Sequence, residues 1–300
     1  MATAKPVSKK AEEVATKGKS APAAKTAVAV PPKKEVAAPQ STEMAAMFEQ
    51  DQGHGMEGAT AESFAIPFLS CLQKSSPQVD EASGAAIEGA KSGMFFENVT
   101  GKMYDGKVGV AFVPCAYRRV FIRWGARGTS EGGFKGEMFP EEVAKLRSEN
   151  KIVDLDGKLF FPLPDGTVND KKCDRVSDTR NHYILLLDDE GGWTQALLSL
   201  TSTQIKKSKA LMSLLGSVKF TSGSGQRFTP STFANIVRVT SIPESNDKGT
   251  WHGVKFDLEG RVEDASLYEA ARAFHGSVVK GAVEVKYEAP VETEGGGNGF

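Results

Sequence analysis

The sequence has 300 residues, of which 40% are hydrophobic and 25% are charged, which is typical of a globular protein that can bury a sizeable core. It contains no run of about 18 apolar residues, which excludes a membrane-spanning helix, and no secretory signal pattern, so we expect a cytoplasmic protein. The formal net charge of −1 hides an uneven distribution, because residues 1–40 carry a net +5 and the rest of the chain carries −6.

The two ends of the chain differ in composition from its middle. Residues 1–42 are built mainly from Ala, Lys, Pro, Val, Thr and Ser without an aromatic residue, which predicts a disordered basic tail. Residues 43–63 predict a linker with a short helix. A single α+β domain is expected at 64–289, and residues 290–300 predict a flexible C-terminal tail.

Short β-type runs dominate the expected domain. They predict strands at 107–113, 117–124, 151–161 with a hairpin turn at Asp156-Gly157, 182–188, 193–200, 235–242 and 251–262. Two helices are expected, at about 202–215 and from 264 or 266 to about 275. Because strands and helices do not alternate, we predict an α+β fold of mainly antiparallel strands, with an OB-like barrel and appended helices.

The most informative stretch is 102–135, which has seven basic residues against two acidic ones and six aromatic residues between them. On a strand, Arg119, Phe121 and Arg123 share one face, and Arg118, Val120, Ile122 and Trp124 share the other. Cationic and flat side chains on one face suit a single-stranded nucleic acid, whose bases stack on rings while arginines meet phosphates. The alternative is that Phe121 and Trp124 belong to the core and that the arginines are solvated.

The helix expected at 202–215 adds three lysines, for which a solvated helix face is the alternative. The candidate nucleic-acid-binding residues are therefore Tyr104, Lys107, Tyr117, Arg118, Arg119, Phe121, Arg123, Trp124, Arg127, Phe134, Lys135, Lys206, Lys207 and Lys209. The C-terminal tail offers Glu292, Glu294 and Phe300 as a candidate docking segment for replication proteins, with a merely frayed terminus as the alternative.

No motif in the sequence predicts an enzyme, a cofactor or a metal site. Gly128 and Gly133 have phosphate-loop spacing, but Phe134 stands where that loop needs its lysine. The acidic triplet Asp188-Asp189-Glu190 fits a hairpin loop between two apolar strands better than the metal site of a nuclease. We therefore expect a non-enzymatic protein.

Several segments resemble a group of tailed-bacteriophage proteins. The similarity lies in residues 66–69, 76–78, 87–93, 113–119, 198–204 and 243–251 (IPFL, SPQ, IEGAKSG, VPCAYRR, LSLTSTQ and PESNDKGTW). We associate this group with phage single-stranded DNA-binding proteins of the OB-fold kind, and the resemblance implies DNA coating in replication or recombination. The long basic N-terminus is not explained by the resemblance.

The leading hypothesis is thus a phage single-stranded DNA-binding protein that stacks bases on aromatic rings and contacts phosphates with Arg and Lys. Its expected partners are single-stranded DNA and, through the tail, replication proteins; a homo-oligomer is also compatible with the sequence. The rival hypothesis is a virion structural or accessory protein whose β-rich domain contacts other proteins.

Overall fold

The computed structural model describes residues 42–59, 64–126, 132–247, 249–283, 285 and 287. Contacts divide the chain into two units, Met1–Gln50 and Asp51–Phe300. The described part of the first unit is helix α1 (Thr42–Gln50), which buries none of its side chains. This is the short helix expected near residue 43, whereas the tail expected before it lies outside the described residues.

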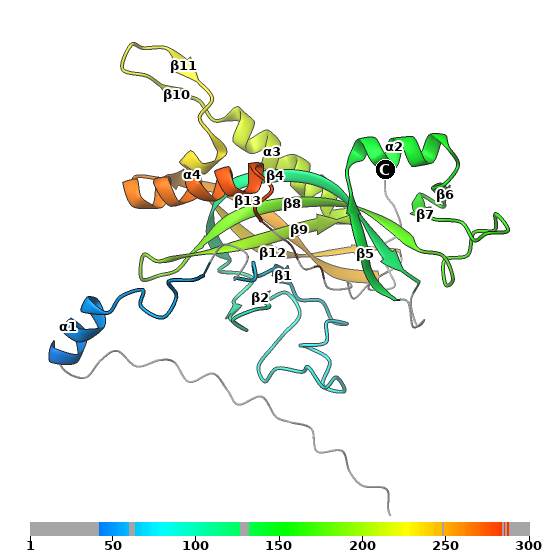
Figure 1. Ribbon diagram of the computed structural model, residues 1–300, viewed down its shortest axis with the longest axis horizontal. Helices are drawn as coiled ribbons and strands as arrows, with labels where there is room; N and C mark the ends of the chain where they lie inside the picture. The colour runs from blue at the N-terminus through cyan, green and yellow to red at the C-terminus, as the bar shows by residue number, and fades with distance from the viewer. Residues whose placement is uncertain are drawn as a thin grey trace, which may run out of the picture. The chain divides into compact units, whose positions relative to one another are not determined.

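An antiparallel sheet of eight strands forms the centre of the second unit (Figure 1). Its strand order is β13-β12-β4-β8-β7-β6, with β5 paired to β4 and β9 paired to β8. The strands are β4 (Val110–Gly125), β5 (Gly133–Met138), β6 (Val153–Leu155), β7 (Lys158–Phe160), β8 (Arg175–Leu187), β9 (Trp193–Thr201), β12 (Asn235–Asn246) and β13 (Gly249–Arg261).

Smaller elements surround this sheet. A three-stranded sheet contains β1 (Leu69–Cys71), β2 (Phe95–Glu97) and β3 (Met103–Tyr104), and a separate hairpin contains β10 (Phe220–Thr221) and β11 (Arg227–Phe228). The helices are α2 (Pro140–Ser148), α3 (Ile205–Ser217) and α4 (Ala265–Val279), and the short 3-10 helices are η2 (Ser202–Gln204) and η3 (Thr232–Ala234). None of the described helices is long and apolar enough to cross a membrane.

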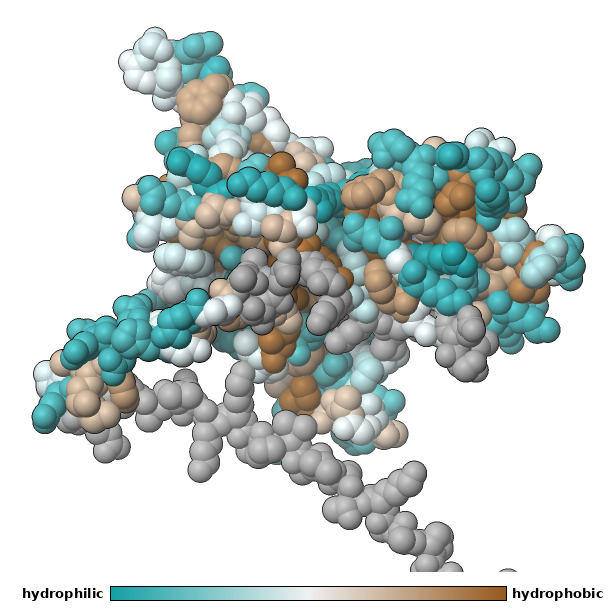
Figure 2. Space-filling view, viewed as in Figure 1, coloured by the Kyte–Doolittle hydropathy of each residue, from teal (hydrophilic) through white to brown (hydrophobic). Residues whose placement is uncertain are grey.

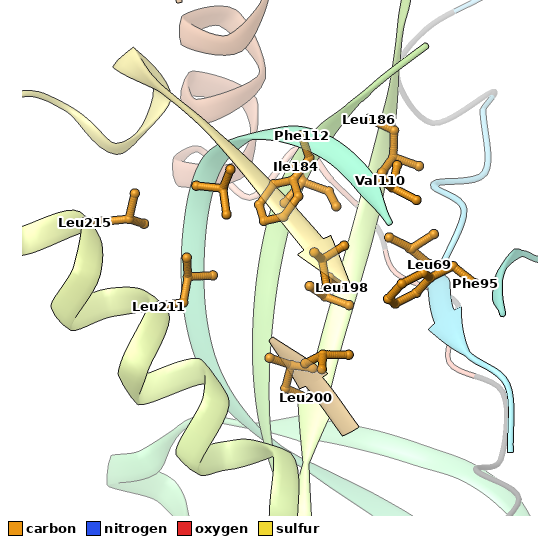
Figure 3. Close-up of a cluster of buried hydrophobic side chains, with 14 residues drawn as sticks. Leu69, Phe95, Val110, Phe112, Ile184, Leu186, Leu198, Leu200, Leu211 and Leu215 are labelled. Atoms are coloured by element: carbon orange, nitrogen blue, oxygen red, sulfur yellow. The ribbon is translucent and has the colours of Figure 1, made fainter. Parts of the chain in front are cut away.

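Both faces of the central sheet are covered. On one face, Leu211 and Leu215 of α3 pack with sheet residues such as Phe112 and Ile184, and Leu69 and Phe95 join the same cluster (Figure 3). On the other face, α4 contributes Leu267, Ala271, Phe274 and Val278 to a cluster with Val113, Cys115, Tyr183, Leu185 and Leu197. A third cluster forms under α2. Burial on both faces explains why β8 reads as a nearly continuous apolar run from His182 to Leu187.

Strand β4 is the longest element of the sheet and unites the two strands expected at 107–113 and 117–124. Pro114 does not end the strand, because Cys115 forms a bulge there: Pro114 pairs with Ile184 and Ala116 pairs with Tyr183. The strand pairs with β8 from Phe112 to Trp124, with β12 at its start and with β5 at its end. One strand therefore joins the α4 region of the sheet to the α2 region.

The predicted α+β class is confirmed, and the hairpin turn at Asp156-Gly157 is confirmed with positive φ angles of 52° and 74°. The closed barrel is not found: over the described residues, the pairing path runs from β13 to β6 without returning to its start. Both expected helices are present, and α4 is capped by Asp264, whose carboxylate accepts a hydrogen bond from the Leu267 amide. Helix α2 and the sheet β1-β2-β3 were not expected.

Candidate nucleic-acid interface

The Cys115 bulge decides which side chains of β4 share a face. Beyond it, Arg119 lies over the Phe121 ring, with 5.0 Å from the guanidinium carbon to the ring centroid, and Arg123 lies 3.9 Å from the Phe161 centroid beside the same cluster. Arg118 points to the opposite face, where its guanidinium donates to the Val278 carbonyl near the end of α4. The predicted separation of Arg119, Phe121 and Arg123 from Arg118 is confirmed.

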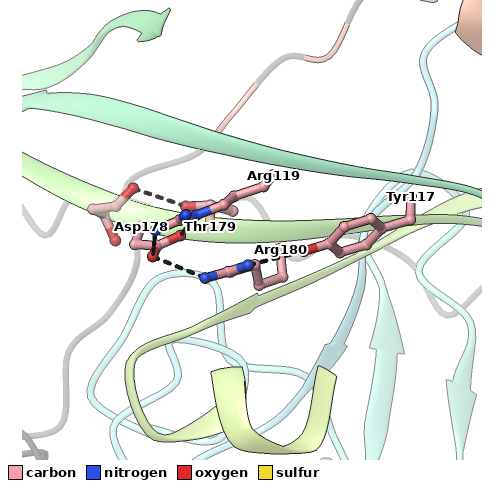
Figure 4. A network of polar contacts seen from close by, with 6 residues as sticks. Tyr117, Arg119, Asp178, Thr179 and Arg180 are labelled. Carbon is pink, nitrogen blue, oxygen red and sulfur yellow. Dashed lines mark hydrogen bonds and ion pairs between the residues drawn. The ribbon is translucent and has the colours of Figure 1, made fainter. Parts of the chain in front are cut away.

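Two aspartates, Asp178 in β8 and Asp174 just before it, pair with the cations on the face of β4 that holds Arg119 and Arg123. Figure 4 shows Asp178 with Arg119 and Arg180. Asp178 accepts two hydrogen bonds from Arg119, at 2.8 and 3.2 Å, and one from Arg180 at 3.1 Å. Asp174 pairs with Arg123 at 2.6 Å and with Lys135 at 3.1 Å. The hydrogen bond to Asp178 raises the pKa of Arg119. A phosphate on this face would have to compete with carboxylates that are already in place.

The aromatic rings of this face are not free platforms. Phe121 is only 6% exposed, because Met138, Val143 of α2, Ile152 and Val176 enclose it. The prediction that its ring stacks on bases is wrong, and the core alternative holds. Tyr117 is half-buried against the His182 ring, at 5.2 Å between centroids, and its hydroxyl accepts a hydrogen bond from Arg180.

The opposite face holds the remaining aromatic candidates of β4 and β5. Trp124 and Phe134 meet edge to face at 6.1 Å, and Phe134 stacks on Tyr287 at 5.3 Å. The Tyr287 hydroxyl accepts a hydrogen bond from Asn181 at 2.6 Å and donates one to Glu137 at 2.7 Å. Burial, followed by the hydrogen bond to Glu137, raises the pKa of Tyr287. These rings pack the chain near Tyr287 onto the sheet, and Phe134 remains 44% exposed.

Other predicted residues lie apart from this cluster. Tyr104 is half-buried against the first core cluster, and burial raises its pKa to about 12. Lys107 lies exposed in the turn before β4, where its amide donates to Asp105. Arg127, Glu292, Glu294 and Phe300 lie outside the described residues. The predicted residues are thus divided among the two faces of β4, the turn before it and α3.

Helix α3 carries two exposed lysines that no described carboxylate neutralises. Lys207 pairs with Glu244 at 2.5 Å, but Lys206 and Lys209 are exposed and have no carboxylate partner in the part of the chain that the structure describes. Lys206 and Lys209 lie one turn apart and share a helix face with four small exposed residues, Ala210, Ser213, Gly216 and Ser217. The opposite face of α3 buries Ser208, Leu211 and Leu215.

The β10–β11 hairpin follows α3 and extends away from the sheet (Figure 1). Phe228 is 46% exposed and meets Phe220 of the paired strand at 6.2 Å, while Arg261 of β13 lies 4.3 Å from the Phe220 centroid. Lys219 and Arg227 are exposed, and neither pairs with a described carboxylate. Figure 2 shows hydrophilic and hydrophobic surface side by side on this hairpin. We call Lys206, Lys209, Lys219, Arg227 and Phe228 the basic ridge.

The sequence carries a signal for this ridge in a long stretch without acidic residues, of which the sequence prediction included the α3 lysines but not Lys219, Arg227 or Phe228. Residues 191–243 contain no Asp or Glu over 53 positions, and they contain six basic residues, Lys206, Lys207, Lys209, Lys219, Arg227 and Arg238. Among the described residues, Lys207 and Arg238 pair with the carboxylates of Glu244 and Glu259, which both lie outside this stretch. An acid-free stretch leaves its cations without local neutralisation, which is what a phosphate-binding surface requires.

The acidic triplet lies in the turn between β8 and β9, so the hairpin prediction is confirmed. Leu187 pairs with Trp193, and the Asp188 carboxylate accepts hydrogen bonds from the amides of Glu190 and Gly192. The described residues contain no group of three or more His, Cys, Asp or Glu side chains that could hold a metal ion.

A family model matches the chain. The model of the Pam3 phage gp34-like protein family matches residues 33–284, which is most of the chain. No curated protein and no solved structure matches this chain. The expected kinship with bacteriophage proteins is therefore confirmed, and the chain belongs to the Pam3 phage gp34-like protein family.

Proposed function

We propose that this phage protein binds single-stranded DNA along the basic ridge and coats it during phage DNA replication or recombination. The observation that carries the proposal is a set of exposed cations on α3 and the following hairpin that have no carboxylate partners among the described residues, together with the exposed Phe228 ring beside Lys219 and Arg227. Phosphates of a strand can meet Lys206, Lys209, Lys219 and Arg227 without displacing an existing ion pair.

The helix surface supports close approach of a strand. Lys206 and Lys209 are flanked by exposed Ala210, Ser213 and Gly216, whose side chains are short. A sugar-phosphate backbone can therefore lie near the helix while the two longer lysine side chains reach its phosphates.

The hairpin supports a single strand over a duplex. The Phe228 ring is exposed next to Arg227, and bases can stack on such a ring only when they are not already stacked and paired. Stacking of this kind contributes about 1–3 kcal/mol per base and tolerates any base sequence.

The test is a fluorescence-anisotropy titration with labelled single-stranded and double-stranded DNA of equal length at several salt concentrations. We expect a salt-sensitive preference for the single strand. The double variant Lys206→Ala, Lys209→Ala should weaken binding and reduce the slope of log affinity against log salt by about 1.4, which is about 0.7 per lost phosphate contact. Phe228→Ala should weaken binding without changing that slope.

The matched control is Lys145→Ala with Arg147→Ala. Both residues are exposed in helix α2, and the double variant removes the same charge from a helix that also carries Glu141 and Glu142. It should leave the affinity unchanged. Equal losses in the α2 and α3 variants, or equal affinity for the two forms of DNA, would contradict the proposal.

A further inference from the structure

A cavity of about 220 Å³ lies near the first turn of α3, between the β12–β13 hairpin and the segments around Gln73 and Ser92. Its lining includes Gln73, Lys74, Ser92, Trp251 and His252. Sites that enclose drug-sized ligands measure roughly 300–1,000 Å³, so this cavity suits one flat ring with part of its substituent.

Hydrogen bonds hold the walls of the cavity. The Gln73 side chain donates to the His252 carbonyl and accepts from the His252 amide, both at 2.9 Å. The His252 ring is 2.8 Å from the Ser92 hydroxyl, measured from Nδ1. Gly93 leaves room for this ring, because a Cβ at that position would lie 2.8 Å from it. The cavity is thus preformed around a fixed imidazole.

Trp251 and Lys74 supply a stacking surface and a charge. The half-buried Trp251 indole donates to Glu244 at 3.0 Å, which fixes the plane of its ring. Lys74 is exposed and forms no ion pair with any described residue. The indole ring can stack on a nucleobase, and the nearby Lys74 ammonium group can bind its phosphate.

The cavity is linked to the basic ridge by an ion pair. Glu244 receives the Trp251 hydrogen bond and also pairs with Lys207 of α3, whose sequence neighbour Lys206 begins the ridge. A strand that follows α3 towards its first turn therefore arrives beside Trp251.

We propose that the Trp251 cavity takes up one nucleotide unit, with the base on the indole and the phosphate at Lys74. The inference rests on the proposed function, since it adds a subsite to the same DNA path. The same chemistry is offered by a free nucleotide, so the test contains both a strand and a mononucleotide.

The experiment uses the full chain with Trp124→Phe and Trp193→Phe, which leaves Trp251 as its single tryptophan. Its emission is followed during titration with unlabelled oligo(dT) and, separately, with dTMP. We expect oligo(dT) to quench Trp251 and dTMP to quench it only at much higher concentration, because the ridge contacts are then missing.

Affinity measurements on the otherwise unchanged chain accompany the titration. Trp251→Leu should lower affinity for single-stranded DNA at least about fivefold, whereas Trp251→Phe, which keeps a ring but loses the bond to Glu244, should retain most of it. Lys74→Ala should reduce the salt slope by about 0.7. The matched control is Trp193→Leu, because Trp193 is exposed at the start of β9 and should not affect binding.

The outcomes separate this inference from the proposed function. Binding that depends on Lys206 and Lys209 but is unaffected by Trp251→Leu and Lys74→Ala, without quenching, would overturn the subsite and leave the function standing. Quenching by dTMP without any strand binding would support the cavity as a free-nucleotide site and overturn the function. No quenching by either probe overturns the subsite.

Discussion

Phe121 and Phe228 are the same residue type in opposite environments. Phe121 is enclosed by Met138, Val143 and Ile152, whereas Phe228 is 46% exposed on the β10–β11 hairpin. Because removal of a buried aromatic side chain leaves a cavity, Phe121→Ala should lower the free energy of unfolding by about 3–5 kcal/mol. Phe228→Ala should change it by less than about 0.5 kcal/mol.

Urea denaturation followed by circular dichroism measures both values. DNA affinity measured on the same proteins completes the comparison: Phe228→Ala should lose affinity while it keeps its stability. A stable Phe121→Ala protein with weakened DNA binding would restore the stacking role that burial argues against.

The stability of the fold should depend on pH through His182. Its ring is 2% exposed, and its Nε2 lies 2.8 Å from the Ser208 hydroxyl of α3. Burial, together with the nearby Arg180 charge, lowers the pKa of His182 from 6.5 to about 4. The unfolded chain therefore takes up a proton below about pH 6.5 that the folded chain does not take up until about pH 4.

Protonation of His182 in the unfolded chain should lower the free energy of unfolding by on the order of 3 kcal/mol as the pH drops from about 6.5 to about 4. Urea denaturation between pH 4 and 7.5 measures the change, and His182→Gln serves as the comparison because its amide cannot take up a proton in this range. The difference between the two proteins should shrink towards low pH. Parallel pH profiles would show that His182 is not the group responsible.

At the scale of elements, the bulge at Cys115 determines which side of the sheet each side chain in the second half of β4 faces. The Cys115 side chain is fully buried in the α4 cluster, and the His275 ring donates from Nδ1 to the Cys115 carbonyl at 2.9 Å. Helix α4 therefore holds the extra residue in place. Without it, each side chain from Ala116 onward would face the opposite side of the sheet.

Deletion of Cys115 should abolish cooperative unfolding, because Phe121 and Arg119 would then exchange faces with Val120 and Arg118. Cys115→Ala keeps the residue count and should retain a cooperative thermal transition at a lower Tm. Circular dichroism melting distinguishes the two variants. A deletion variant that melts like the Ala variant would show that the register does not depend on the bulge.

The elements that could be predicted from sequence are those with strong local patterns. The Asp156-Gly157 turn, the hairpin of β12 and β13, and helices α3 and α4 follow from turn residues and apolar spacing. The gap expected at 114–116, between two strands, was wrong because a bulge at Cys115 lets one continuous strand run through it. Helix α2 was missed because its nine residues bury only Val143, which leaves almost no periodic signal.

At the scale of the whole molecule, the cations of β4 were visible in the sequence but their neutralisation was not. Asp178 lies 59 positions from Arg119, and Asp174 lies 51 positions from Arg123. Only the pairing of β4 with β8 brings these charges together. The charge of the basic ridge can be predicted without knowing which strands pair, because it arises from a continuous stretch of sequence without acidic residues.

The position of β4 in the sheet also affects how the chain folds as it is made. Phe112 pairs with Val237, so this contact cannot form until residues far towards the C-terminus have left the ribosome. Pairings so distant in sequence carry a large loop-closure entropy and slow folding. We therefore expect the sheet to be completed only near the end of synthesis. Nascent chains that stop before β12 should leave the start of β4 unpaired and open to chaperones.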